Sequence, residues 1–295
     1  MAFQVSPGVL VQERDLTRII PAVSTAIGAF AGSFNKGPLD EIVSISSEQE
    51  LVDTFGKPDS TNFEYFFSAA NFLQYSNSLR VVRATQTNAV NASTSGTGVL
   101  IKNTDDWTNN YASGGQAGNA TFVAREAGTD GNNLQVSTCP NAAAYEEEGA
   151  TTVNDASTAV GDTVVVTTSG AALNVGDIIS FSTTAATNDY DDGEQYRVTN
   201  ISTNDVTIVQ HPRGTGGLKR ALTDGSNIRR RWKYYDAVDG APGTSTYVSE
   251  RNGANDEIHV VVIDEDGGIS GVPGTILETF SKLSKASDAK DPQGN

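Results

Sequence analysis

Residues 63–84 read FEYFFSAANFLQYSNSLRVVRA, a helical pattern followed at once by a strand pattern. The first half carries apolar residues with the three- and four-residue spacing of an amphipathic helix: Phe63, Phe66, Phe67, Ala70, Phe72 and Leu73. Residues 79–84 form a short, mainly apolar run that predicts a strand. Strands that alternate with helices favour an α/β fold.

The residues before this stretch continue the alternation. Residues 23–31 predict a buried strand and residues 42–45 a short one. Ser47 and Glu50 have the spacing of a capping box, which predicts a short helix that Gly56 closes. The α/β pattern therefore begins well before the aromatic helix.

The C-terminal part returns to the same pattern. Residues 256–263 contain a continuous apolar run, which is typical of a strand covered on both faces. Residues 264–268 predict a turn. An amphipathic helix is expected over residues 275–286, because Ile276, Leu277, Phe280 and Leu283 have helical spacing.

The middle of the chain differs from both flanking parts. A low-complexity linker opens it at residues 88–98. Short strands separated by turn residues follow, at 163–167, 176–181, 196–199 and 206–209. Such a series predicts a small barrel or sandwich.

We therefore predict an α/β (α+β) domain with an inserted all-β domain and an extended N-terminal arm. The expected limits are an arm at 1–22, a first α/β part at 23–97, the insertion at 98–220 and a second α/β part at 221–295.

The arm has the pattern of a detached strand. Apolar residues alternate along residues 3–11, and Pro7 confines such a strand to a sheet edge. A detached strand usually joins a sheet, often on another molecule. The predicted contacts are Val5, Pro7, Gly8, Val9, Leu10 and Val11. Pairing within the protein's own sheet is the alternative, and the pattern leaves both open.

Composition excludes several classes of function. The 295 residues carry 36 acidic and 20 basic side chains, a formal net charge of −16. General nucleic-acid binding is excluded because it needs a basic surface. The single cysteine, Cys139, cannot form an intrachain disulfide. The most apolar stretch, 22–34, is too short and too interrupted to span a membrane, so no membrane insertion is expected.

Signals of catalysis are poor. The two histidines are His211, in a predicted loop, and His259, in an apolar run where a structural role is favoured. No phosphate-binding loop, nucleophile elbow or Cys/His metal spacing occurs. The acidic clusters at 189–194 and 264–267 could bind Ca²⁺, but neither matches the complete calcium loop. We expect no enzymatic activity, no cofactor and no metal.

One compact basic cluster stands out in this acidic chain. It comprises Arg229, Arg230, Arg231 and Lys233, interleaved with Trp232, Tyr234 and Tyr235. Alone, the pattern would fit nucleic acid. At this net charge we favour pairing with acidic groups, either within the molecule or on a neighbouring copy. The alternation also fits an ordinary half-exposed strand.

Several segments, in this order, resemble the tail sheath proteins of contractile-tailed bacteriophages. They are residues 6–13 (SPGVLVQE), Gly37-Pro38 with 42–45, 50–58 (ELVDTFGKP), 124–136 (AREAGTDGNNLQV) and 267–278 (GGISGVPGTILE). The resemblance covers both α/β parts and some of the middle.

This resemblance implies a structural subunit of the virion, assembled in the host cytoplasm. Family members form hexameric rings stacked around a tail tube, and the sheath contracts to drive the tube through the host envelope. The implied partners are further copies of the chain, the tail tube protein, and the baseplate and tail terminator proteins. Family members continue beyond Asn295, so the tube-facing region and C-terminal arm are expected to be missing.

An alternative function is binding of a host glycan or receptor by the β-rich insertion. An exposed cluster of aromatic residues would favour it, and Tyr190 and Tyr196 are the candidates.

Overall fold

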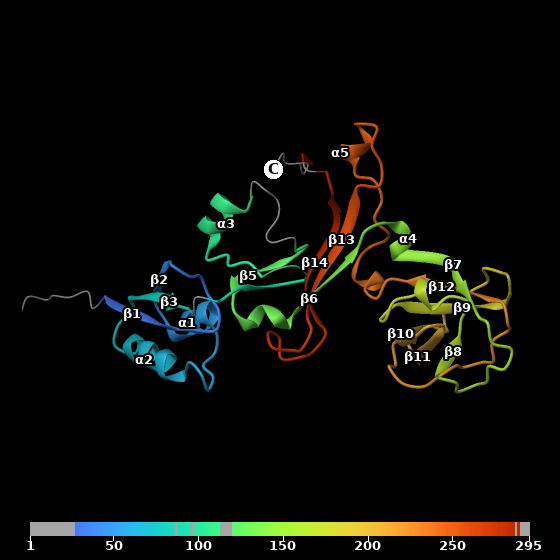
Figure 1. The fold of residues 1–295 in the computed structure, drawn as a ribbon, viewed down its shortest axis with the longest axis horizontal. Coiled ribbons are helices and arrows are strands. Elements are labelled where there is room, and N and C mark those ends of the chain that lie inside the picture. Colours follow the sequence, from blue (N-terminus) through green and yellow to red (C-terminus); the bar gives the residue numbers. More distant parts are fainter. Residues whose placement is uncertain are drawn as a thin grey trace, which may run out of the picture. The chain divides into compact units, whose positions relative to one another are not determined.

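The structure is a computed structural model that describes residues 27–85, 88–94, 96, 98–112, 120–286 and 288–289. The chain divides into two compact units, Met1–Asn132 and Asn133–Asn295 (Figure 1). The predicted arm, 1–22, lies outside the described residues. Within the described residues, no helix combines the length and the apolar character needed to cross a membrane.

The first unit contains a three-stranded sheet in the order β1-β3-β2. Strand β1 (Gly28–Ser33) runs parallel to β3 (Leu79–Ala84), and β2 (Ile42–Ile45) runs antiparallel to β3. Helices α1 (Glu48–Phe55) and α2 (Phe63–Leu73) pack against this sheet. The helices and strands predicted between residues 42 and 84 are therefore confirmed.

Helix α1 begins and ends as its sequence predicts. The Ser47 hydroxyl accepts the backbone N–H of Glu50 at 3.2 Å. In return the Glu50 carboxylate accepts the N–H of Ser46 at 2.7 Å, so the box closes one residue earlier than expected. Gly56 ends the helix with a φ of +87°, which glycine adopts without a steric penalty.

The core of this unit lies between the helices and one face of the sheet. Alternate side chains of β3, at Leu79 and Val81, are buried against Phe66 of α2. Burying a large apolar side chain stabilises a fold by about 1.5–3 kcal/mol. Only part of the predicted stripe takes part, because Phe63 and Phe67 remain about half exposed.

A two-stranded ribbon completes the described part of the first unit. It pairs β4 (Asn91–Ser93) with β5 (Val123–Ala127), and helix α3 (Thr104–Asn110) lies between them in sequence. The side chain of Asn91 is buried, donates to the carbonyl of Ala124 at 2.9 Å and accepts the N–H of Ile101 at 2.7 Å. The expected linker at 88–98 thus contains an ordered strand.

The second unit contains a six-stranded antiparallel sheet in the order β7-β12-β9-β10-β11-β8. Its strands are β7 (Glu146–Thr152), β8 (Val164–Val166), β9 (Ile178–Ala185), β10 (Tyr196–Ser202), β11 (Asp205–Gln210) and β12 (Ser226–Arg231). Its two edges meet where Val153 forms a bridge with Thr167, and the N–H of Thr168 donates to the carbonyl of Thr152 at 2.9 Å. The sheet therefore closes on itself around a buried apolar core.

Strand β12 pairs with β7 and β9, although the expected limit at residue 220 assigns it to the second α/β part. The sequence signal was ambiguous because three consecutive arginines obscure the strand pattern. The domain limits themselves remain a prediction.

A second sheet of this unit has the order β14-β13-β6. It contains β6 (Leu134–Cys139), β13 (Glu257–Asp264) and β14 (Thr275–Ser284). Short helices α4 (Ala142–Tyr145) and α5 (Thr246–Ser249) lie in its connections. The predicted strand at 256–263 is confirmed. The fold as a whole is mixed α/β with several sheets.

The helix expected at 275–286 is wrong, because these residues form β14. Two bulges interrupt its pairing with β13. One of them inserts a residue between Phe280, opposite Val260, and Leu283, opposite Ile258. Two side chains three residues apart therefore lie on one face, which imitates helical spacing.

Candidate interaction sites

The basic cluster lies on β12 and forms a network of ion pairs. Arg230 and Arg231 stand directly opposite Glu147 and Glu146 of β7. Their guanidinium groups lie 3.0 Å from the Glu147 carboxylate and 2.9 Å from the Glu146 carboxylate, respectively. Opposite charges facing each other across antiparallel strands stabilise the pairing.

Arg229 and Arg231 share two carboxylates. Asp192, in the loop before β10, pairs with both, and Glu146 lies 3.8 Å from the Arg229 guanidinium. Arg229 also stacks on Tyr190, 4.7 Å from the ring centre. The acidic cluster at 189–194 therefore contacts β12 through the ion pairs of Asp192 and the ring of Tyr190.

Burial and ion pairing shift the pKa values of this network in opposite directions. Burial alone would lower the pKa of Arg231, but the hydrogen bond and charge of Glu146, with the charge of Asp192, raise it. Burial raises the pKa of Asp177, while Asn174 and the charge of Arg230 oppose that shift. The Arg230 guanidinium thus compensates Asp177, the carboxylate of this network that the fold removes from water.

The predicted charge-pairing residues divide into two kinds. Arg229, Arg230 and Arg231 are largely buried and paired within the chain. Lys233 is exposed and lies 4.9 Å from the ring centre of Tyr234. Intramolecular pairing, one of the two alternatives from the sequence, is therefore present. Pairing with a neighbouring copy remains a prediction, and the predicted arm contacts, Val5 to Val11, lie outside the described residues.

A second charged site, missed by the sequence analysis, is centred on Arg83 of β3. Its side chain is 5% exposed and donates to the carbonyls of Phe34, Asn35 and Gly37 at 2.9, 2.9 and 2.7 Å. Burial lowers the pKa of Arg83, while the charge of Glu126 opposes that shift. The signal was weak because a charged residue in a strand usually faces solvent.

Strand β5 and the residue after it contact the loop at residues 34–37 as well. The Glu126 carboxylate accepts the N–H of Gly37 at 2.5 Å. Gly128 has a φ of +129°, and a Cβ there would lie 2.5 Å from the carbonyl oxygen of Asn35. Any other residue would push the loop away. We call residues 34–37, Arg83, Glu126 and Gly128 the loop clamp.

The imidazole of His259 makes structural contacts. His259 is fully buried, with Nε2 2.8 Å from the carbonyl oxygen of Gly240. Its Nδ1 accepts the N–H of Lys282 at 2.9 Å, which places the ring proton on Nε2. The imidazole therefore links β14 to the segment before β13. Within the described residues, no group of three or more His, Cys, Asp or Glu side chains could hold a metal ion.

The two tyrosines named for a receptor surface do not form one. Tyr196 is fully buried, and its hydroxyl accepts the N–H of Lys219 at 2.9 Å. Tyr190 is covered by Arg229, and its hydroxyl accepts the N–H of Gly149 at 2.9 Å. Neither ring offers a free stacking platform.

Comparison with known proteins places the first unit in context. Residues 25–84 match the family model described as the tail sheath protein Gp18 domain III N-terminal region. That range coincides with β1, β2, α1, α2 and β3.

Two curated relatives are both named tail sheath protein. The relative from Enterobacteria phage T4 is 35% identical over 131 residues, which cover 44% of this chain and 20% of the relative. The relative from Vibrio phage KVP40 is 40% identical over 78 residues, which cover 26% and 12%. The chain thus spans only about one fifth or less of these relatives. These matches confirm that the chain resembles the tail sheath proteins of contractile-tailed bacteriophages.

Proposed function

We propose that this chain is part of a structural subunit of a contractile phage tail sheath. In this proposal the complete protein forms hexameric rings stacked around the tail tube, and contraction drives the tube through the host envelope. The match of residues 25–84 to a tail sheath domain carries the proposal.

A sheath subunit that transmits force needs internal joints that hold while the subunits move. The loop clamp supplies one, because four hydrogen bonds and a close glycine hold residues 34–37 between β3 and β5. The ion pairs of β12 supply another. Both support a structural role and need no catalytic group.

The N-terminal arm is the proposed link between subunits. Each strand hydrogen bond contributes about 0.5–1.5 kcal/mol net, while ordering each residue costs about 1–2 kcal/mol. Burial of Val5, Val9 and Val11, at about 1.5–3 kcal/mol each when complete, makes the balance favourable. A modest link repeated through a lattice becomes strong by multivalency.

The proposed partners are further copies of the chain, the tail tube protein, and the baseplate and tail terminator proteins. The complete protein would reside in the virion tail after assembly in the host cytoplasm. Lys233 remains the candidate for charge pairing with a neighbour, since it is the exposed member of the basic cluster.

Deletion of residues 1–18 from the complete protein tests this function. We expect the deleted protein to keep the circular dichroism of the intact one but to form no polymers in electron microscopy. The intact protein is the reference for both measurements. Normal sheaths from the deleted protein would contradict the role of the arm. Absence of any ring or tube lattice from the intact protein would contradict the sheath function.

A further inference from the structure

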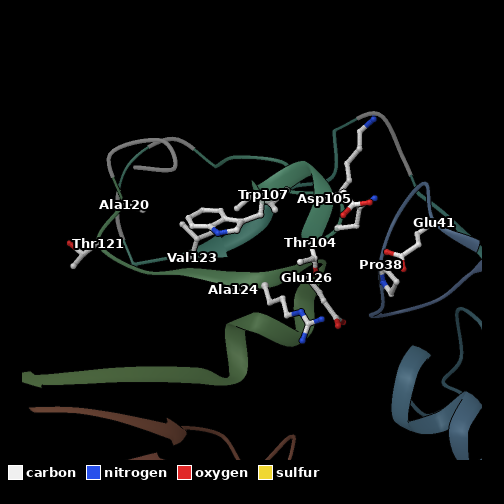
Figure 2. A pocket seen from close by; sticks show the side chains of 14 residues that line it. Pro38, Glu41, Thr104, Asp105, Trp107, Ala120, Thr121, Val123, Ala124 and Glu126 are labelled. Carbon is white, nitrogen blue, oxygen red and sulfur yellow. The ribbon is translucent and has the colours of Figure 1, made fainter. Parts of the chain in front are cut away.

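A cavity of about 650 Å³ lies beside α3 in the first unit (Figure 2). Three segments line it: the loop at 38–41, residues 101–107, and residues 120–126 leading into β5. The proposed sheath function assigns no role to it. We propose that this cavity binds a cationic alkyl side chain, the guanidinium of arginine or the ammonium of lysine, presented by a protein segment.

One wall of the cavity is an aromatic platform. Trp107 is 38% exposed and stacks on Tyr111, with ring centres 6.1 Å apart and planes inclined by 14°. The Tyr111 hydroxyl donates to the carbonyl of Leu100 at 3.2 Å, which holds the stacked pair in place. Figure 2 shows the indole lying across the cavity above Val123. An indole face held in this way attracts cations.

The charges around the cavity favour a cation over an anion. Three carboxylates line it, those of Glu41, Asp105 and Glu126, and Figure 2 shows all three toward its Pro38 end. Glu126 accepts the N–H of Gly37, whereas Glu41 and Asp105 make no hydrogen bond or ion pair with other described residues. Their charge is therefore available to a ligand.

The basic residues of the lining do not cancel this charge. Lys102 is paired with Asp40 at 2.6 Å, so it is already neutralised. Arg125 is exposed and has no ion-pair partner among the described residues. Two unpaired carboxylates, those of Glu41 and Asp105, thus lie beside one unpaired cation, that of Arg125. A neutral sugar would use only the indole, whereas a cation would also be attracted by these carboxylates, so a cationic ligand fits better.

The chain supplies its own reporter for binding. It contains two tryptophans, Trp107 in the cavity and Trp232 buried in the second unit. A ¹H–¹⁵N spectrum of the 295-residue chain therefore has two indole N–H signals, and Trp107→Phe identifies the first by its loss. The probes are N-acetyl-arginine amide, its neutral isostere N-acetyl-citrulline amide, and glucose. Spermidine separates a free polyamine from a protein side chain.

We expect saturable shifts of the Trp107 signal with the arginine probe, and none with citrulline or glucose. Asp105→Asn should weaken binding by roughly two- to fivefold, as expected for loss of one exposed charge pair. Arg125→Gln should strengthen it, because it removes a like charge. Asp224→Asn, an exposed carboxylate in the second unit, should have no effect.

Several results would overturn the proposal. Equal shifts with N-acetyl-citrulline amide and N-acetyl-arginine amide would show that the cavity selects ligands by shape and not by charge. Saturation by glucose alone would make it a sugar site, and tighter binding of spermidine than of the arginine probe would make it a polyamine site. No shift with any probe would show that the cavity binds no such cation. None of these outcomes depends on sheath assembly.

Discussion

At the scale of single residues, Arg83 holds the loop at 34–37 of the first unit through three hydrogen bonds. It lies on the buried face of β3, between apolar Val81 and the loop at 34–37. Its three donors satisfy three carbonyls that would otherwise be buried without partners. A planar guanidinium can do this, whereas the point charge of lysine cannot.

Replacing Arg83 by Met is expected to destabilise the first unit by about 3–5 kcal/mol, because three carbonyls and Glu126 lose their partner. The free energy of unfolding of Arg83→Lys should fall between that of the unaltered chain and that of Arg83→Met. Urea unfolding measures the change, and Arg80→Met on the exposed face of β3 is the matched control, with an effect within about 0.5 kcal/mol. Equal costs at both positions would rule out the clamp.

Asp256 is a buried residue of the second unit whose carboxylate makes the stability of the fold depend on pH in the acid range. Burial alone would raise its pKa, but hydrogen bonds from Ser284 and Ser245 outweigh burial and hold the pKa at about 2. An unfolded aspartate has a pKa of about 3.9. The stabilisation from these bonds is therefore complete above about pH 4 and is lost as the pH falls toward 2.

We expect the melting temperature of the Asp256→Asn variant to fall less steeply between pH 4 and 2 than that of the unaltered chain. Above pH 5 the variant should be the less stable of the two, since a neutral amide accepts weaker hydrogen bonds. Asp224→Asn, which lacks these partners, should follow the unaltered profile. Parallel profiles for all three proteins would show that Asp256 does not contribute to the acid transition.

At the scale of elements, ion pairs connect β12 to β7 and to the loop before β10. The alternation of β12 sends Arg229 and Arg231 to one side and Arg230 to the other, and each side finds acidic partners. A slip of one residue along β7 would still place a glutamate opposite Arg230, because residues 146–148 are all Glu. The network therefore strengthens the strand pairing, while burial of Ile228 in the apolar core specifies the register.

A double-mutant cycle on Arg230 and Glu147 should give a coupling energy of about 0.2–1 kcal/mol. Arg230→Gln alone should cost more than Glu147→Gln alone, because it also removes the cation near the buried Asp177, 3.8 Å away. Added salt should reduce the coupling, since Glu147 is 45% exposed. Zero coupling at low salt would mean that the pair does not set the strand pairing.

At the scale of the whole molecule, the six-stranded sheet has the connections of an insertion. The chain enters it after Tyr145 and leaves it at Trp232, and the N–H of Trp232 donates to the carbonyl of Tyr145 at 2.8 Å. The two connections therefore lie side by side. We propose that residues 146–231 form the inserted domain, which is a narrower range than the sequence suggested.

Replacing residues 146–231 by a short Gly-Ser linker should leave the rest of the chain soluble and folded, because the linker spans one hydrogen-bonded contact. Residues 146–231 expressed alone should show the circular dichroism of a β protein. Gel filtration and urea unfolding of both pieces check this. An insoluble remainder, beside a soluble complete chain, would mean that the two parts share a core.

The sequence by itself determined the α/β pattern of residues 42–84, the strands of the β-rich middle, the buried β13 and the family resemblance. These features follow from local periodicity, capping residues and short motifs, which depend on neighbours in the chain. Tertiary structure alone decided that residues 275–284 form a strand, since bulges against β13 produce their helical spacing. It also decided the roles of Arg83 and Arg229–Arg231, because a charge is buried only where distant segments supply its partners.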